Sequence, residues 1–404
     1  MPETKASPII LVLLPMMVAL FVGYLVTGMA LPVLPLHVHT GLGQSSFVVG
    51  LVAGSQFAAA LLSRFWAGHY ADSKGAKRAT VVGLFAATVS GLIYLASLLF
   101  SDTPAISAAI LVLGRGVLGG AESFIITGAL GWGLALAGSQ NAGKVIALVG
   151  MAMYIAFAVG APIGSALYAH SGFAAISLAT AFIPLAALAL IAPLQPVAPH
   201  ASSGPPVAQV VKAVWLPGIC LAFSSVGFGS MTTFVVLLFA ERGWNPVWLP
   251  FTLFSASFVV GRLFFGHLPD RIGGVRVAVI CVLIEAAGQL VLWLAPSSAM
   301  GLAGAVLTGL GYSLVYPGFG VEAVRRVPPQ SRALAMGAYT AFLDLTLGVA
   351  NPALGLLAGV AGQGAVFAAS ALLILCSAVA ALGFLRRAPA DRAPSTTIRT
   401  PSPK

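Results

Sequence analysis

Twelve long apolar runs, separated by charges and loop-breaking residues, dominate the pattern of the chain. The runs lie near residues 9–33, 46–67, 79–100, 105–128, 144–168, 172–194, 213–239, 248–267, 276–295, 298–322, 332–358 and 363–385. A helix needs about 20 apolar residues to cross the hydrocarbon core of a bilayer. Because backbone polar groups in lipid must be satisfied within the segment itself, these runs predict twelve membrane-spanning α-helices.

Two segments do not follow this pattern. Residues 196–212 are rich in Pro, Ser and Ala, which is typical of a flexible linker. Residues 386–404 are basic, rich in Pro, Ser and Thr, and without apolar periodicity, so we expect them to be disordered. The predicted organisation is an N-terminal six-helix half (1–195), a cytoplasmic linker, a second six-helix half (213–385) and a basic tail.

Composition agrees with a membrane protein and gives its orientation. Only 7% of the residues are charged and 59% are apolar, whereas a soluble domain has about 25% charged residues. The net charge of +10 suggests nucleic acid as a partner, but most positive residues lie in short loops on one side of the predicted helices. This distribution is a topology signal rather than a nucleic-acid site, and it predicts that both termini are cytoplasmic.

The sequence contains no pattern typical of a metal site or an enzyme. The three cysteines are isolated in apolar runs, at Cys220, Cys281 and Cys376. No metalloprotease, hydrolase or nucleotide-binding motif is present in the sequence. We therefore expect no cofactor, no metal and no enzymatic activity, and we do not expect a pump driven by nucleotide hydrolysis.

Two motifs occur twice, about half the chain apart. "RFWAGHYAD" at 64–72 returns as "RLFFGHLPD" at 262–270, and each copy closes an even-numbered predicted helix. "AVGAPIGS" in the fifth run resembles "GVANPALG" in the eleventh, with Pro162 and Pro352 at matching places. Equal placement in both halves is typical of a parallel duplication around an axis along the membrane normal.

These motifs resemble those of the major facilitator superfamily, and the resemblance covers almost the whole chain. The family's loop between helices two and three reads approximately G-x-x-x-D-R-x-G-R-R. The first copy matches it at Gly68, Asp72, Gly75 and Lys77, and the second at Gly266, Asp270, Arg271 and Gly273. In the first copy Ser73 stands where arginine is usual.

Two further motifs refine the resemblance. "GRGVLGG" at 114–120 resembles the family's buried-arginine motif and gives Arg115 that place. Gly160, Pro162 and Gly164 resemble the Gly-Pro motif of the proton-coupled exporters, although Ala161 separates the usually adjacent pair. Within the superfamily, the chain resembles the bacterial YhhS-type branch, which is grouped with drug and sugar efflux permeases, and this resemblance implies a location in the inner membrane of a bacterium.

The resemblance implies an all-α, twelve-helix, monomeric transporter that exchanges small molecules and protons by alternating access. It also implies a conformational latch, in which Asp72 contacts the start of helix eleven near Ser331 in the outward-facing state. The latch set is Gly68, Asp72, Lys77, Gly266, Asp270 and Arg271. The alternative is that these loop charges only enforce topology and solubility.

A few ionisable residues lie within the apolar runs, where they are costly and by default mark a functional path. Arg115 and Glu122 are seven residues apart on one helix face, about 10 Å along the axis. Asp344 lies about twelve residues into the eleventh helix, near the bilayer centre. A carboxylate there can exchange a proton for a cation or for Arg115, which is the chemistry of a proton-coupled antiporter. A fixed structural ion pair is the alternative.

Three other charged residues within the apolar runs are expected to have structural roles. Arg64 and Arg262 are expected to reach the interface or to pair with the loop aspartates. Glu285 is expected in the outer scaffold, where it hydrogen-bonds a neighbouring helix.

Uncharged polar residues predict the rest of a cavity. Tyr24, Gln56 and Tyr154 are its main candidates, with hydroxyls at Thr27, Ser224, Ser225, Thr232 and Thr233. A mostly apolar cavity with one or two carboxylates favours small amphipathic organic compounds, often cationic. The helix-five motif favours export, and proton-coupled import of a nutrient remains the alternative because it uses the same carboxylates.

Overall fold

The computed structural model describes residues 9–138, 141–197, 207–327 and 332–387, and every regular element in these ranges is helical. The long helices are α1 (Ile9–Leu36), α2 (Ser46–Lys74), α3 (Ala76–Ser97), α4 (Pro104–Ala137), α5 (Ala142–Ile191), α6 (Val207–Thr233), α8 (Leu249–Phe265), α10 (Gly274–Leu294), α11 (Ser298–Tyr312), α13 (Arg332–Ala361) and α14 (Gln363–Arg387). Shorter elements are the π-helical turn η1 (His37–Gly41), the 3-10 turn η2 (Leu98–Phe100), and α7 (Val235–Glu241), α9 (Leu268–Ile272) and α12 (Val315–Arg325).

The helices confirm the expected all-α membrane fold. Ten helical segments of the described chain are long and apolar enough to cross a membrane. One of them is α5, a run of 50 residues in which Gly172 has non-helical torsion angles (φ 66°, ψ −165°) and separates two helices. The apolar helix α8 has 17 residues and is slightly shorter than these ten segments. The expected count of twelve is reached when α5 is counted twice and α8 once.

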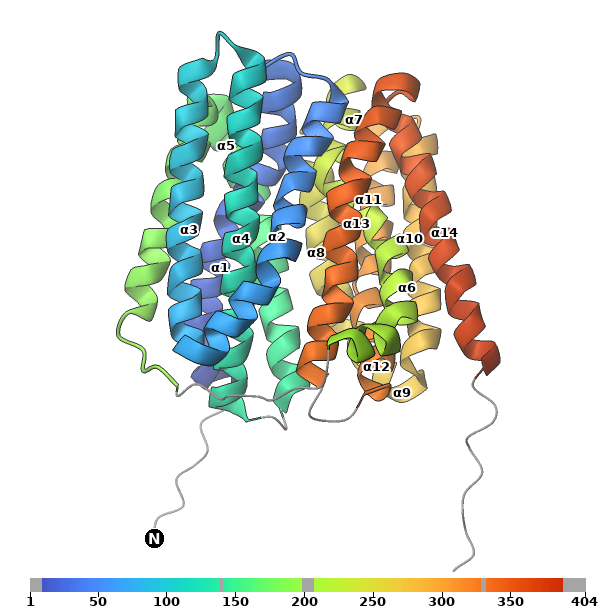
Figure 1. The fold of residues 1–404 in the computed structure, drawn as a ribbon. Helices are drawn as coiled ribbons and strands as arrows, with labels where there is room; N and C mark the ends of the chain where they lie inside the picture. The colour runs from blue at the N-terminus through green and yellow to red at the C-terminus, as the bar shows by residue number, and fades with distance from the viewer. Residues whose placement is uncertain (1–8, 139–140, 198–206, 328–331, 388–404) are drawn as a thin grey trace, which may run out of the picture.

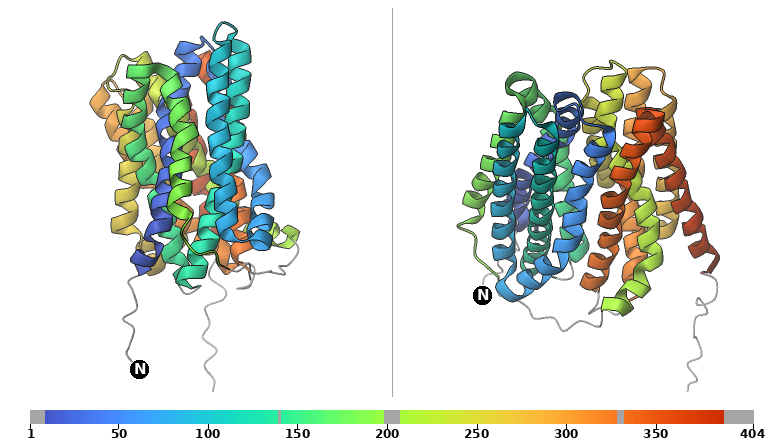
Figure 2. Two further views of the ribbon diagram at one scale, coloured as in Figure 1. Left: turned by 90° about the vertical axis from the view of Figure 1, so that its left-hand side faces the viewer. Right: turned by 45° about the horizontal axis from the view of Figure 1, so that its top comes forward.

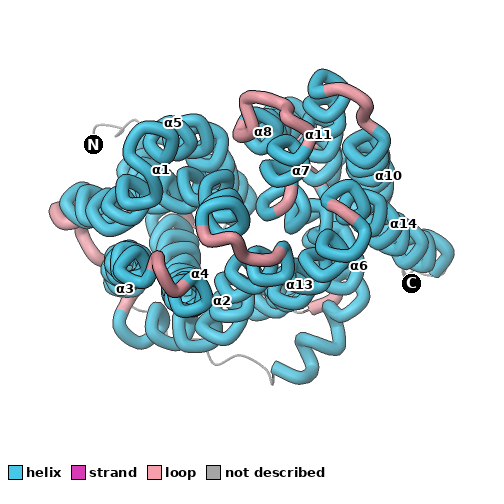
Figure 3. The backbone as a smooth tube through the Cα atoms, turned by 90° about the horizontal axis from the view of Figure 1, so that it is seen from above, coloured by secondary structure: helices cyan, strands magenta, loops and turns pink. Residues whose placement is uncertain are grey.

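The bundle consists of two groups of helices. In Figure 1, α1 to α5 form the left group, while α6 to α14 form the right group. The view from above in Figure 3 shows the two groups side by side, and α2 meets α13 between them. Behind this pair, α5 packs against α8 across the same boundary. The beginning of α1 and the end of α14 lie at the lower end of the bundle in all side views (Figures 1 and 2).

The sequence repeat is visible in the backbone. Gly75 and Gly273, which follow the two copies at a spacing of 198 residues, have φ angles of 96° and 98°. Glycine adopts this region without the steric cost that other residues bear. The copies differ just before this point, because α2 continues to Lys74 whereas α8 stops at Phe265 and the short α9 follows. Pro269 lies in the first turn of α9, where a missing N–H group is tolerated.

Two predicted spans, at 213–239 and 298–322, each contain a break in the structure. Phe234 separates α6 from α7, and Ser313 and Leu314 separate α11 from α12. Beside the breaks, Thr232 and Ser313 donate hydrogen bonds to carbonyl groups of the preceding turn. Such bonds compete with the helical ladder and often bend it.

The segments expected to be flexible lie mostly beyond the described residues. The linker was expected at 196–212, but α6 begins at Val207, so its last part is helical. The tail was expected from Arg386, and α14 extends to Arg387. Residues 388–404 lie outside the described part of the chain.

At the upper end of the bundle, α2 and α13 touch through their backbones. A Cβ atom on Gly50 would overlap the carbonyl oxygen of Asn351, and one on Gly355 would overlap the carbonyl oxygen of Ser46. Small residues of this kind allow helices in membranes to approach closely. Toward the lower end the two helices diverge (Figure 1). The two groups are therefore held together at the upper end.

We predict that Gly50→Ala lowers the free energy of unfolding by about 1–3 kcal/mol, because the added methyl group cannot fit against the α13 backbone. Gly359→Ala is the matched control, since no atom lies within 4 Å of a Cβ at this position of α13. Helix propensity alone makes this control neutral or more stable by up to about 1 kcal/mol. Thermal unfolding of the purified protein in detergent measures both. Equal effects of the two substitutions would contradict the close contact.

Candidate functional site

A buried ion pair joins the two groups of helices. Arg64 of α2 donates to Oδ2 of Asp344 in α13, from Nε at 2.9 Å and also from Nη2. The Asp344 side chain is 5% exposed and that of Arg64 19% exposed. The other ion pair among the described residues, Arg326 with Glu322, lies within a single helical turn at the surface. The one buried pair that the structure describes therefore spans the boundary between the halves.

The sequence did not predict that these two residues pair. Arg64 was expected at the interface or on a loop aspartate. Asp344 was expected to exchange a proton for a cation or for Arg115, with a fixed structural ion pair as the alternative. Arg64 lies ten residues before the end of α2, which corresponds to a depth of about 15 Å. An arginine at that depth cannot reach Asp72 along its own helix, so it pairs with the nearest carboxylate on the facing helix.

Glu122 is held by hydrogen bonds from two other helices. Its Oε1 accepts from the Thr27 hydroxyl of α1 at 2.8 Å, and its Oε2 accepts from Nε2 of Gln56 in α2 at 2.6 Å. Gly119 of α4 allows this approach, because a Cβ there would overlap the Gln56 backbone. The buried Tyr24 hydroxyl finds no hydrogen-bond partner among the described residues and lies within electrostatic range of Glu122. The structure thus brings three predicted cavity residues around one carboxylate.

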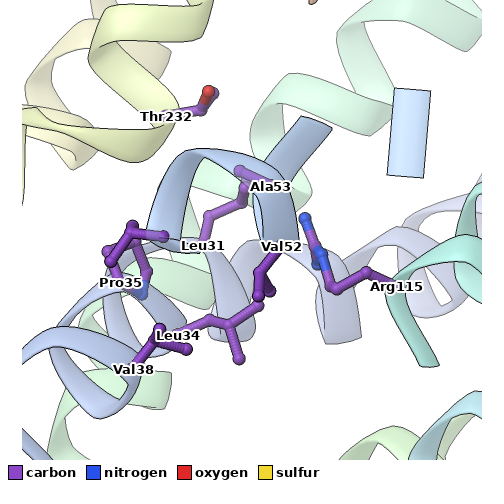
Figure 4. Close-up of a pocket in the computed structure, with 9 residues that line it drawn as sticks. Leu31, Leu34, Pro35, Val38, Val52, Ala53, Arg115 and Thr232 are labelled. Atoms are coloured by element: carbon purple, nitrogen blue, oxygen red, sulfur yellow. The ribbon is translucent and has the colours of Figure 1, made fainter. Parts of the chain in front are cut away.

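Arg115 is 1% exposed and forms no hydrogen bond or ion pair with a described residue. It lies seven residues before Glu122 on α4, and the hydrogen bonds of Glu122 go to Thr27 and Gln56 instead. Its side chain borders a small cavity of about 10 Å³, room for about one water molecule, between helices of the first half and Thr232 of α6, shown in Figure 4. The lining residues are Leu31, Leu34, Pro35, Val38, Val49, Val52, Ala53, Arg115 and Thr232. Arg115 is the one charged residue of this otherwise mostly apolar lining.

Tyr154 contacts the second half through its ring. It stacks on Phe258 of α8, with 3.5 Å between the ring centroids and 11° between the planes. Its neighbour Phe157 packs edge-on against both Tyr154 and Tyr24. An aromatic layer therefore connects the predicted residues Tyr24 and Tyr154 across α5.

The helix-five motif packs α5 onto α1. A Cβ on Gly160 would lie 2.8 Å from the Gly28 carbonyl carbon, and one on Gly164 would overlap the Met29 carbonyl oxygen. Pro162 lies between the two glycines inside the helix. The motif thus sets the distance between two helices of the same half and does not touch the ion pair.

The expected latch residues lie at the lower end. Asp72 is exposed and bonds to no described residue, and Ser331, its expected counterpart, lies outside the described residues. Lys77 instead donates to the carbonyl oxygens of Ala192 and Leu194, at 2.8 and 2.6 Å, and ties α3 to the end of α5. The other members are Gly68, Gly266, Asp270 and Arg271, and the last three are exposed. The latch therefore stays a prediction.

Glu285 lies apart from these groups, in the packing of the second half. It is completely buried in α10 and accepts a hydrogen bond from Ser224 of α6, in agreement with the expected contact to a neighbouring helix. One turn later, Gln289 accepts from Ser230 at 2.9 Å. Among the described residues, no three His, Cys, Asp or Glu side chains gather into a group that could hold a metal ion.

Comparisons with known proteins agree with this architecture. The sequence model of the Major Facilitator Superfamily matches residues 16–268 and 219–404. An uncharacterized MFS-type transporter of Salmonella typhimurium is 42% identical over 369 residues, which cover 91% of this chain and 95% of the relative. The uncharacterized MFS-type transporter YhhS of Escherichia coli is 40% identical over 380 residues, covering 93% and 94%.

Solved structures show the same fold at low sequence identity. The nucleoside transporter NupG superposes with a TM-score of 0.73 at 13% identity, covering 92% of this chain and 99% of NupG. The fucose:proton symporter FucP of E. coli superposes with a TM-score of 0.66 at 13% identity, covering 93% and 99%.

Proposed function

Because the chain belongs to the major facilitator superfamily and is a multi-pass membrane transporter, we propose that it exports small amphipathic organic compounds in exchange for protons, by alternating access. It works as a monomer in the bacterial inner membrane, with both termini in the cytoplasm. The positive-inside distribution of Lys and Arg supports this orientation. The lower end of the bundle, where α1 begins and α14 ends, is then the cytoplasmic end.

The observation that carries the proposal is the Arg64–Asp344 pair between the halves. A buried pair is stable only while both charges are present, because a lone charge in a low-dielectric environment is strongly destabilising. Protonation of Asp344 removes one charge and releases α2 from α13 at this depth. Loss of the proton restores the attraction. Proton binding and separation of the halves are thus coupled through one carboxylate.

The contact between the halves at the upper end agrees with either direction of transport. The Gly50 and Gly355 contacts hold α2 against α13 at the outer end, as expected for a conformation that opens toward the cytoplasm. An exporter takes up its cargo from that side. The helix-five motif at Gly160, Pro162 and Gly164 favours export. Import of a nutrient with protons remains the second candidate, because an importer releases its cargo on the same side.

The proposal is tested in inside-out membrane vesicles that contain a pH-sensitive dye and begin with equal pH on both sides. We expect at least one member of a panel of amphipathic anions, cations and neutral compounds to make the lumen alkaline when it is added outside. Asp344→Asn abolishes the response, because it cannot release a proton. Glu322→Gln is the matched control, since it removes a surface carboxylate of α12. Acidification of the lumen identifies a symporter and overturns export, and an unchanged response in Asp344→Asn overturns coupling at this residue.

A further inference from the structure

The repeat places a second arginine opposite a residue that is not a carboxylate. Arg262 in α8 corresponds to Arg64 in α2, at the spacing of 198 residues that relates the two copies. Pro162 in α5 and Pro352 in α13 are equivalent positions 190 residues apart. At the same spacing, Tyr154 in α5 is the position equivalent to Asp344 in α13. One boundary between the halves therefore contains Arg and Asp, whereas the equivalent boundary contains Arg and Tyr.

Arg262 reaches across its boundary as Arg64 does. Its guanidinium carbon lies 5.4 Å from the centroid of Phe258, the ring on which Tyr154 stacks. On the facing helix α5, a Cβ at Gly150 would lie 2.6 Å from Nη1 of Arg262. Because Gly150 has no side chain, the guanidinium group of Arg262 has room at this point.

No protein carboxylate neutralises Arg262 within the described part of the chain. It forms no hydrogen bond or ion pair with a described residue. Its guanidinium lies over the Phe258 ring, which in turn contacts the rings of Tyr154 and Tyr312. The three carboxylates within the nearby helices already have other partners. Asp344 binds Arg64, Glu122 accepts from Thr27 and Gln56, and Glu285 accepts from Ser224.

Tyr316 and Tyr312, on the two sides of one helix break, lie near the two boundaries. The Tyr316 hydroxyl lies 2.8 Å from that of Thr340, one turn before Asp344 in α13. The ring of Tyr312 lies 6.1 Å from that of Phe258, next to Arg262. The break between α11 and α12 lies beside Tyr316, and broken helices often mark substrate sites in transporters. The ring of Phe228 stacks on Tyr312 and provides an apolar wall.

We propose that Arg262 binds a carboxylate of the transported compound, so that the substrate supplies the charge that Tyr154 lacks. Arginine holds a carboxylate with two parallel hydrogen bonds, and the aromatic rings around Tyr154 and Tyr312 contact the apolar part of the compound. The favoured substrate is then a small aromatic or aliphatic organic acid. This replaces the expectation of mainly cationic substrates, because Arg115 and Arg262 bond to no carboxylate among the described residues, whereas the carboxylates of Asp344, Glu122 and Glu285 all accept hydrogen bonds from the protein. The inference rests on the proposed function for its substrate.

Binding to the purified protein tests the inference without any transport step. The probes are 1-naphthoate, its methyl ester and 1-naphthylmethylammonium, which share one ring system and differ in charge. We expect naphthoate to bind at least tenfold more tightly than the other two, as measured by intrinsic tryptophan fluorescence and thermal stabilisation. Arg262→Gln removes this preference and Arg262→Lys retains part of it. Arg276→Gln, which changes an exposed arginine of α10, leaves it unchanged.

A second variant restores the missing carboxylate. Tyr154→Glu is expected to pair with Arg262, as Asp344 pairs with Arg64, and to weaken naphthoate binding at least tenfold. Tyr154→Gln, of similar size and uncharged, retains the preference for the acid. Failure of naphthoate to bind, equal binding of the three probes, or a preference that survives Arg262→Gln overturns the inference. Naphthoate binding without proton movement in vesicles leaves the inference intact and contradicts the proposed coupling instead.

Discussion

Oxidation of a variant with Ala58→Cys and Gly348→Cys is expected to stop transport completely, and reduction is expected to restore it. A Cβ atom built on Gly348 lies 3.4 Å from the Cβ of Ala58, close to the separation of about 3.5–4.5 Å found in disulfides. Ala58 belongs to α2 and Gly348 to α13, so the bond joins the two halves. If transport requires the outer side to open here, the covalent link holds the protein in one state.

A second cysteine pair provides the matched control. Ala59→Cys with Gly116→Cys has a Cβ separation of 3.8 Å, but both residues belong to the first half. Both pairs are introduced into a protein without Cys220, Cys281 and Cys376. The measurement is the transport rate before oxidation with copper phenanthroline, after it, and after reduction, with bond formation verified by mass spectrometry. Undiminished transport by the protein cross-linked between α2 and α13 would show that the halves do not part at this level.

Substitution of Arg64 alone is expected to destabilise the protein more than substitution of both members of the ion pair. Arg64→Gln leaves the charge of Asp344 buried without its partner, which costs about 3 kcal/mol. This value is at the low end of the usual range because Arg64 is 19% exposed. Combining Arg64→Gln with Asp344→Asn removes both charges and recovers most of the loss.

The two single variants and the double variant form a thermodynamic cycle. Thermal unfolding in detergent gives the coupling free energy, which we expect to be about 2 kcal/mol or more for a pair in direct contact. The pair has two roles, in stability and in the coupling of protons to transport, and proton exchange in vesicles separates them. The double variant is expected to regain stability but not to exchange protons for substrate. Additive effects of the two substitutions would show that the pair contributes no mutual stabilisation.

Most of the fold follows from the length of the apolar runs. Each run had to be long enough for a bilayer, and the repeated motifs identified the two halves before any contact was known. The breaks at Phe234 and Ser313 did not follow, because hydroxyl residues such as Thr232 and Ser313 occur in many of the runs and do not mark a break by themselves. Hydropathy reports the environment of a residue and contains little information about local hydrogen bonding. For the same reason, the helix was predicted to begin near residue 213, whereas α6 begins at Val207.

The members of the site were easier to predict than their partners. Glu122 and Asp344 are recognisable as carboxylates within apolar runs. Their partners come from other helices and depend on how the helices are rotated and spaced, which a single sequence does not specify. Counting the depth of Arg64 along α2 would have excluded Asp72 as its partner. That Tyr154 faces Arg262 as Asp344 faces Arg64 could be recognised only from the two repeat spacings together with the stacking of Tyr154 on Phe258.

The glycine contacts between α2 and α13 restrict how the gene for this protein can change. Every single-nucleotide change of a glycine codon that alters the amino acid introduces a larger residue. At Gly50 and Gly355 each such change inserts atoms between two backbones that already touch. Random mutation at these two codons therefore acts in one direction only, toward a bundle that opens more readily on its outer side.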